Sequence, residues 1–121
     1  MRIGSSLINA YSGMKTFEDA SSVTANNVAN VATSTFKSQT PVIQEMPSGG
    51  STVSSIVKDD SQGPLTESVL AGGQFGLVEG SNVDLPKETV NSVIYRSAYE
   101  ASAKMLKTSD EMVQRAIDIV A

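Results

Sequence analysis

The sequence predicts a mainly α protein, in which two long terminal helices pair as an antiparallel coiled coil and a small β-rich, loop-rich excursion lies between them. Apolar residues recur at helical spacing at both ends of the 121-residue chain, whereas residues 38–83 hold seven of its nine glycines. We therefore expect residues 1–32 to form an N-terminal helix, 33–83 a turn-rich and β-rich excursion, and 84–121 a C-terminal helix. The two helices together would form one core domain.

The composition argues against several classes of function. The chain has no cysteine and no histidine, so it lacks thiolate ligands, the commonest zinc ligand and the commonest general base. Its net charge is -4, and its lysines and arginines form no basic run of the kind that binds nucleic acid. No stretch approaches the roughly 20 apolar residues of a membrane helix, and no secretory signal is legible. We expect no catalytic residue, metal, cofactor, nucleic-acid partner or membrane insertion.

The N-terminal helix has an apolar face but a weak seam. On a projection of about 100° per residue, the face spans an arc of roughly 120°. It comprises Ile3, Leu7, Ala10, Tyr11, Met14, Phe17 and Val28. As heptads, one row runs through Ala10, Phe17 and Thr24 and the other through Leu7, Met14, Ser21 and Val28. Polar residues in these rows make the helix dependent on a partner, and we expect it to end near residue 31.

The C-terminal helix has the stronger signal. Asp84 can cap it, Pro86 fits its first turn, and Glu88 suits the positive end of its dipole. Its wide apolar side comprises Ile94, Ala98, Tyr99, Ala101, Met105, Leu106, Met112, Val113, Ala116, Ile119 and Val120. This side is wider than one partner helix covers, so we expect it to contact neighbouring subunits as well as the first helix.

The opposite side of the C-terminal helix is charged. Glu100 with Lys104, and Glu111 with Arg115, have the i,i+4 spacing of ion pairs that each stabilise a helix by a few tenths of a kcal/mol. We interpret this side as a solvated face.

The excursion contains two β-prone runs, at residues 41–46 and 51–57. Gly49-Gly50 and Gly72-Gly73 mark loops or bends. The unpaired edges of such strands could pair with another subunit, and the alternative is a surface loop without a partner. Asp59-Asp60 is interpreted as a solvated turn, because two adjacent carboxylates alone make a poor cation site.

Residues 25–37 read Ala-Asn-Asn-Val-Ala-Asn-Val-Ala-Thr-Ser-Thr-Phe-Lys. This text resembles the N-terminal signature of the bacterial flagellar basal-body rod and hook proteins. The matching positions are Asn26, Asn27, Asn30, Phe36 and Lys37. The family usually has glycine before the aromatic residue. Thr35 stands here instead, which puts in question a left-handed turn that glycine would permit.

Three further blocks follow in the order of the same family. Residues 60–67 resemble its Ser-Gln-Gly stretch, and Asn82, Val83 and Asp84 match the start of its C-terminal signature, which continues at 98–101 and 109–112. Larger members insert a globular domain between the second and third blocks, whereas here only residues 68–80 separate them. The chain is thus similar to a minimal axial subunit, with its proximal or distal position open.

The resemblance implies a structural subunit of the periplasmic rod of the flagellar basal body, assembled with itself and with other rod or hook subunits into a helical tube. It also implies export by the flagellar type III apparatus without a cleaved signal peptide, and helices that order on assembly. The alternative is a secreted adaptor or assembly factor that docks through the same helices. A wall hydrolase is a third hypothesis, which lacks a catalytic constellation. The three asparagines could contact a neighbour or simply terminate the helix.

Overall fold

The computed structural model describes residues 3–121, and the predicted contacts of the Ile3 side chain fall outside what it describes. In chain order its elements are α1 (Ile3–Ala29), β1 (Gln39–Glu45), β2 (Ser51–Lys58), β3 (Leu65–Val69), β4 (Phe75–Glu79) and α2 (Leu85–Val120). Two long helices with a small β-rich region between them were predicted, and this is confirmed.

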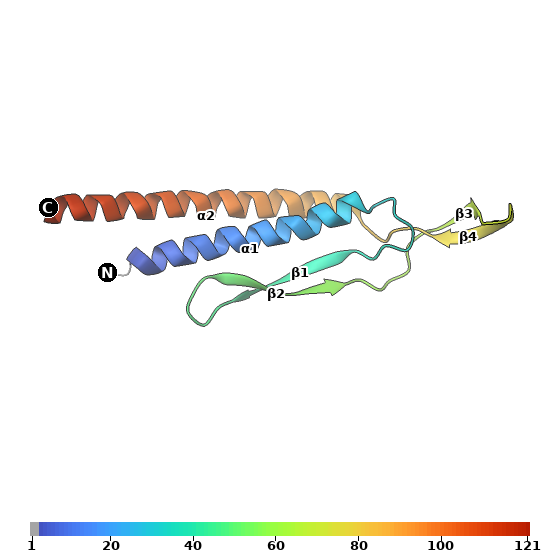
Figure 1. Ribbon diagram of the computed structural model, residues 1–121, viewed down its shortest axis with the longest axis horizontal. Coiled ribbons are helices and arrows are strands. Elements are labelled where there is room, and N and C mark those ends of the chain that lie inside the picture. The colour runs from blue at the N-terminus through green and yellow to red at the C-terminus, as the bar shows by residue number, and fades with distance from the viewer. Residues whose placement is uncertain (1–2) are drawn as a thin grey trace.

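The molecule is elongated, with α2, α1 and the β1–β2 hairpin side by side along its long axis (Figure 1). α1 lies between α2 and the β1–β2 hairpin and contacts both. The two termini are at the same end, so the helices run in opposite directions. The β3–β4 hairpin projects from the other end, and within the described residues it contacts no helix or other strand.

The helix ends follow from local chemistry. At the start of α2, the Asp84 carboxylate accepts a hydrogen bond from the amide of Lys87 at 3.3 Å, as the sequence predicted. α1 ends at Ala29, close to the expected residue 31. There the Asn30 side chain donates to the carbonyl oxygen of Asn26 at 2.9 Å, and the Asn30 amide donates to the same oxygen at 3.2 Å.

The seam between the helices is narrower and more polar than expected. Its buried apolar residues are few and small, whereas Thr24, Asn27, Glu88 and Ser109 are also buried. A Cβ atom on Gly13 would lie 2.8 Å from the Ser102 hydroxyl oxygen, so the helices approach closely at this point. Little apolar area is therefore removed from water, and the helix pair gains little hydrophobic stabilisation.

One of the two rows predicted for the α1 seam is wrong: the row of Leu7, Met14, Ser21 and Val28 was placed one residue too far along the chain. Ala10, Phe17 and Thr24 lie in the seam or at its edge, but they alternate with the buried Gly13, Ala20 and Asn27. The row of Leu7, Met14, Ser21 and Val28 lies on the flank instead. The physical reason is that small residues allow close approach of the helices, and the other flank of α1 is occupied by the β1–β2 hairpin.

The β-prone runs form β1 and β2, which pair antiparallel with a bulge between Val42 and Ile43. The hairpin is tied along α1 where Thr16 donates to the carbonyl oxygen of Ser51 at 2.8 Å. The pairing of β3 with β4 was not predicted. Its turn contains Gly72 and Gly73, whose φ angles of 96° and 79° favour glycine.

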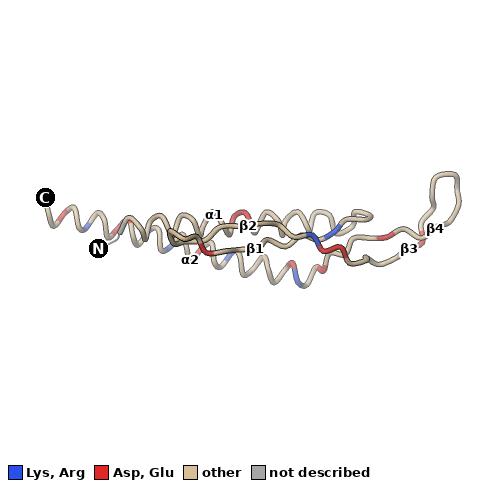
Figure 2. The backbone as a smooth tube through the Cα atoms, turned by 90° about the horizontal axis from the view of Figure 1, so that it is seen from below, with Lys and Arg blue, Asp and Glu red and all other residues tan. Residues whose placement is uncertain are grey.

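Charges of both signs are interspersed along the molecule (Figure 2). The predicted pairs of Glu100 with Lys104 and Glu111 with Arg115 are not formed among the described residues. Glu100 instead accepts from Arg96 at 3.1 Å on an exposed surface. Exposed pairs gain little over water, so the choice among such partners is nearly neutral in free energy.

Thr35 has φ 62°, so the chain makes the left-handed turn without the glycine that usually permits it. This conformation costs an L residue about 1–2 kcal/mol. Thr35→Gly should therefore stabilise the fold slightly, by about 0.5 kcal/mol after the entropy that glycine adds to the unfolded chain. Denaturant unfolding in a stabilising osmolyte measures the change. The control Thr40→Gly, on an exposed strand residue, should destabilise the fold; equal destabilisation by both would contradict the strained turn.

Candidate interaction site

The side chain of Asn27 joins three elements. It is fully buried, and its Oδ1 accepts from the amide of Gln39 at 2.9 Å. Its Nδ2 donates to the Gln39 carbonyl oxygen at 2.7 Å and to Oε1 of Glu88 at 3.0 Å. The side chain therefore bonds both backbone groups of Gln39, the first residue of β1, as a neighbouring strand would. It also donates to Glu88 in the first turn of α2.

Glu88 is a carboxylate that the helix pair buries, with 4% of its surface exposed. Its charge lies in the first turn of α2, where the helix dipole favours an anion, and the Asn27 amide donates to it. Tyr95 lies seven residues after Glu88, on the same face of α2. Its burial, and after that the negative charge of Glu88, raises the pKa of Tyr95. Tyr95 stacks on Phe17 with ring centroids 6.4 Å apart.

A second junction, which we call the neck, lies between the helix pair and the β3–β4 hairpin, where Asn82 and Lys37 hydrogen-bond to other segments of the chain. Asn82 accepts from the amide of Ser38 at 2.6 Å and donates to the carbonyl oxygens of Asp59 at 2.7 Å and Ser61 at 3.0 Å. Lys37 donates to the Ser61 carbonyl oxygen at 2.8 Å and to Oε1 of Glu79 at 2.5 Å. This neck fixes where the hairpin leaves the body of the molecule.

The remaining signature residues have local roles. Asn26 and Asn30 hydrogen-bond each other at 3.1 Å at the helix end, which is the structural alternative considered for them. Phe36 and Val83 are half-buried near the neck, and Asp84 caps α2. The signature text therefore marks the two junctions, and Asn27, Lys37 and Asn82 form most of their hydrogen bonds.

Sequence reasoning missed the seam role of Glu88, which it treated only as a favourable charge for the helix dipole. A signal was present, because Glu88, Tyr95, Ser102, Ser109 and Ala116 recur every seven residues, and all five are buried or half-buried. The pattern was hidden because three of its members are polar. Ser109 is fully buried, and its hydroxyl has no hydrogen-bond partner.

The predicted interface residues divide into two groups. Leu7, Met14, Phe17, Ala98, Leu106 and Val113 are half-buried in the single chain. The others, which are exposed, are Tyr11, Val28, Ile94, Tyr99, Met105, Met112 and Ile119. Within one chain the second group has little to pack against, so any role at an interface requires another molecule.

Several of the exposed residues form a row along one flank of α2, which we call the α2 stripe. The α2 stripe comprises Val90, Ile94, Ala101, Met105, Met112 and Ile119. Val90, Ala101 and Met112 are 11 residues apart, a repeat of 3.67 residues per turn that keeps the row nearly parallel to the helix axis. Met105 is 57% exposed and Ile119 is 84% exposed. An uncovered apolar row of this length is typical of an interaction surface.

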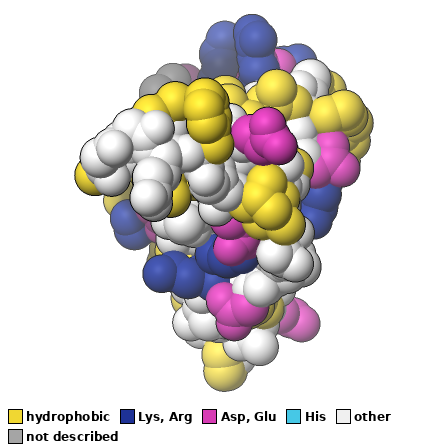
Figure 3. Space-filling model, turned by 90° about the vertical axis from the view of Figure 1, so that its right-hand side faces the viewer, with side chains coloured by type: hydrophobic (Ala, Val, Ile, Leu, Met, Phe, Trp, Pro, Cys, Tyr) yellow, Lys and Arg dark blue, Asp and Glu magenta, His cyan; other side chains and the backbone are white. Residues whose placement is uncertain are grey.

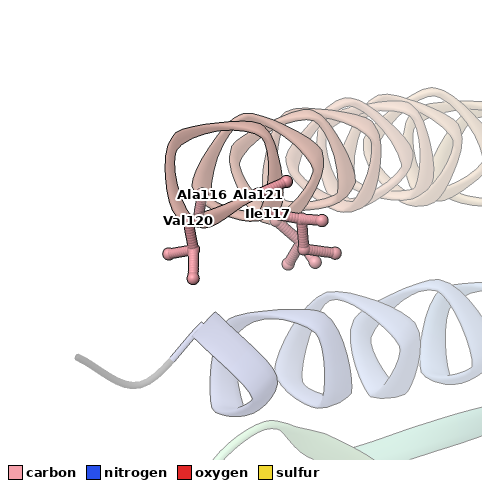
Figure 4. A pocket seen from close by; sticks show the side chains of 5 residues that line it. Ala116, Ile117, Val120 and Ala121 are labelled. Carbon is pink, nitrogen blue, oxygen red and sulfur yellow. The ribbon is translucent and has the colours of Figure 1, made fainter.

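A second apolar surface lies at the C-terminal end of α2, where Val113, Ala116, Ile117, Val120 and Ala121 line an open hollow. The side chains of Ile117 and Val120 point toward the side on which α1 begins (Figure 4). The lining has no polar side chain, so the hollow offers apolar contact and no group for chemistry.

Within residues 3–121, no helix is long and apolar enough to cross a membrane. The same residues contain no group of three or more acidic side chains placed to hold a metal ion. The carboxylate of Asp59 instead accepts from the Ser61 amide at 3.0 Å, and hydrogen bonds from Ser61 lower its pKa.

Comparison with known proteins finds similarity to flagellar proteins over part of the chain. Residues 74–119 match the family model for the C-terminal region of the flagellar basal body rod proteins FlgE, FlgF and FlgG. The flagellar basal-body rod protein FlgG of Agrobacterium fabrum is 34% identical over 71 residues, which are 59% of this chain and 24% of that protein. The flagellar hook protein FlgE of Escherichia coli is 36% identical over 44 residues, which are 36% of this chain and 11% of that protein.

Over the matched residues, the chain is similar to the flagellar rod and hook proteins. It spans about a quarter of the rod relative and about a tenth of the hook relative. The matched C-terminal region includes all of the α2 stripe and, in β4, the Glu79 of the neck.

Asn27→Ala should destabilise the fold by about 2–4 kcal/mol, because it leaves the Glu88 carboxylate buried without its donor and both backbone groups of Gln39 unpaired. Asn26→Ala is the matched control. Asn26 is exposed and bonds only within the helix end, so its loss should cost under about 1 kcal/mol. Denaturant midpoints in a stabilising osmolyte measure both, and equal effects would contradict the junction.

Protonation of Glu79 should open the neck at low pH. Hydrogen bonds from Lys37 and from the amide of Gly63 lower the pKa of Glu79 below its ordinary 4.5. A lowered folded-state pKa means that this contribution is present above pH 4.5 and is lost as the pH falls through the lower value. The NMR shift of the Gly63 amide should therefore titrate with a midpoint below 4.5. Lys37→Gln should raise the midpoint; a wild-type midpoint at or above 4.5 would contradict the ion pair.

Proposed function

We propose that the protein is a structural, non-enzymatic subunit of the bacterial flagellar basal-body rod. In this role α1 and α2, paired as an antiparallel coiled coil, pack with other copies and with other rod or hook subunits into a helical tube that transmits torque. The α2 stripe is the observation that carries the proposal, because it is long, apolar and uncovered in the single chain. The similarity to flagellar rod and hook proteins supports the setting.

The rod is favoured over the hook by the short segment between β3 and α2. Only residues 68–80 separate the two signature blocks between which larger members insert a domain, and this segment forms one hairpin. Most of the described molecule therefore consists of the two helices and the segments joined to them. In a helical tube, most of such a subunit would lie within the wall and little of it would project outside.

The polar seam also suits the proposed route of delivery. A chain exported through a narrow channel by the flagellar type III apparatus must unfold first, and no disulfide can form in a chain without cysteine. Glycine, serine, threonine and asparagine in the helix seam keep the free subunit easy to unfold. Burial of the α2 stripe by neighbours would then supply stability at the place of assembly, the periplasmic rod.

Met105→Asp should abolish assembly while leaving the isolated chain as folded as the wild type. Met105 is 57% exposed in the single chain, so a charge there meets water until a neighbour covers it. Lys107→Asp is the control, since Lys107 is exposed on the other side of α2. Sedimentation of basal bodies and swimming of complemented cells report assembly. Normal basal bodies with Met105→Asp would refute a buried stripe.

A further inference from the structure

The β3–β4 hairpin has an apolar face that nothing in its own chain covers. Cross-strand pairing places Leu65, Glu67 and Val69 of β3 on the same face as Phe75 and Leu77 of β4, with Glu79, the partner of Lys37, at the neck end of this face. Phe75 is 80% exposed and Leu77 is 65% exposed. Seen from the hairpin end, apolar side chains lie at the surface beside acidic ones (Figure 3). A two-stranded hairpin is at best marginally stable alone, so this face needs a partner.

Glu67 lies in the middle of this face. It pairs across the strands with Leu77, and the apolar Leu65 and Val69 flank it on its own strand. The ion pairs among the described residues do not include it. A partner must therefore offer apolar contact and a cation beside it, because an apolar surface alone would leave this carboxylate desolvated without a partner.

The α2 stripe offers that combination. Lys104 and Arg115 lie three residues after Ala101 and Met112 of the stripe, and they border it on one side. The two basic residues are 11 residues apart, in step with the apolar repeat. By contrast, the exposed face of α1 near Tyr11 carries Glu18 and Asp19 beside a single lysine. Glu100 and Glu111 precede these two cations by four residues, but at about 100° per residue they lie further from the stripe, so the charges next to the α2 stripe are basic and charge complementarity favours it.

The hairpin cannot reach this part of α2 in its own chain. It projects beyond the start of α2, whereas Ala101 lies about 24 Å further along that helix, at 1.5 Å per residue. The pair can meet only if a second copy is displaced along the long axis. Five strand residues span about 17 Å, which is close to the roughly 21 Å from Ala101 to Arg115.

We propose that the β3–β4 hairpin of one copy docks on the α2 stripe of a second copy, with Glu67 beside Lys104 or Arg115. The contact uses different surfaces on the two copies and does not close on itself, so it extends an open filament in one direction. The inference rests on the proposed function, because it names one contact by which the subunits would assemble.

The absence of cysteine allows a direct test by disulfide formation between copies. One tagged chain carries Leu77→Cys and a second, differently tagged chain carries Met105→Cys, both at exposed positions. After the two are assembled together and oxidised, the expected product is a disulfide that joins the two tags. The control replaces the second chain by Ile8→Cys, which is 65% exposed on α1 and should give at least tenfold less product.

The outcomes separate this contact from the proposed function. Sedimenting assemblies without a disulfide between residues 77 and 105, or with equal linkage to residue 8, would overturn the docking and leave a rod subunit standing. Failure of the wild-type chain to assemble with any rod subunit would overturn both. Charge reversal gives an independent readout. Glu67→Lys should lower assembly at least tenfold, and Lys104→Glu with Arg115→Glu in the same chain should restore it; no restoration would overturn the charge pairing.

Discussion

The buried amide of Asn27 is the interaction on which the arrangement of the molecule depends. α1 contacts everything else in the helical body, and this one side chain holds both of its neighbours, β1 through the backbone of Gln39 and α2 through the carboxylate of Glu88. An amide is suited to this because it donates and accepts at once. Its neighbours in the seam are threonine, serine, alanine and glycine, which offer little apolar area to compensate for its loss. A contact whose loss is expected to cost about 2–4 kcal/mol is a large part of the roughly 5–15 kcal/mol that stabilises an ordinary domain.

This distribution of stability connects the fold to the proposed role. The apolar side chains that would normally form a core are instead on the surface, along the α2 stripe, at the end of α2 and on the β3–β4 hairpin. Polar contacts inside the chain therefore specify which elements meet, and apolar contacts between chains would supply most of the free energy. In the proposed role, specificity within the subunit and stability within the assembly would be separated, so that a chain delivered unfolded would still reach one structure.

Much of the fold could be predicted from periodicity and caps. The apolar spacing of both ends, the cap at Asp84 and the β-prone runs before and after Gly49-Gly50 were each sufficient, because these signals are local. Most of the seam could not be predicted, because apolar periodicity finds large side chains and, apart from the stacked Phe17 and Tyr95, this seam is made largely of small and polar ones. β3 and β4 were missed because their alternation of apolar and polar residues is broken, in β3 by Glu67 at an apolar position and in β4 by the order of Val78 and Glu79. The signature residues were found by resemblance, but only the geometry distinguishes Asn27, which joins three elements, from Asn26, which does not.

Hydrogen–deuterium exchange measured on the dilute chain and on assembled rods tests most directly whether the stability of the helices comes from their neighbours. We expect the amides of α2 from Val90 to Ile119 to exchange rapidly in the dilute chain and to gain at least a hundredfold protection in the assembly, with the largest gain along the α2 stripe. Full protection of α2 in the dilute chain, unchanged on assembly, would contradict the division between polar contacts that specify the subunit and apolar contacts that stabilise the filament.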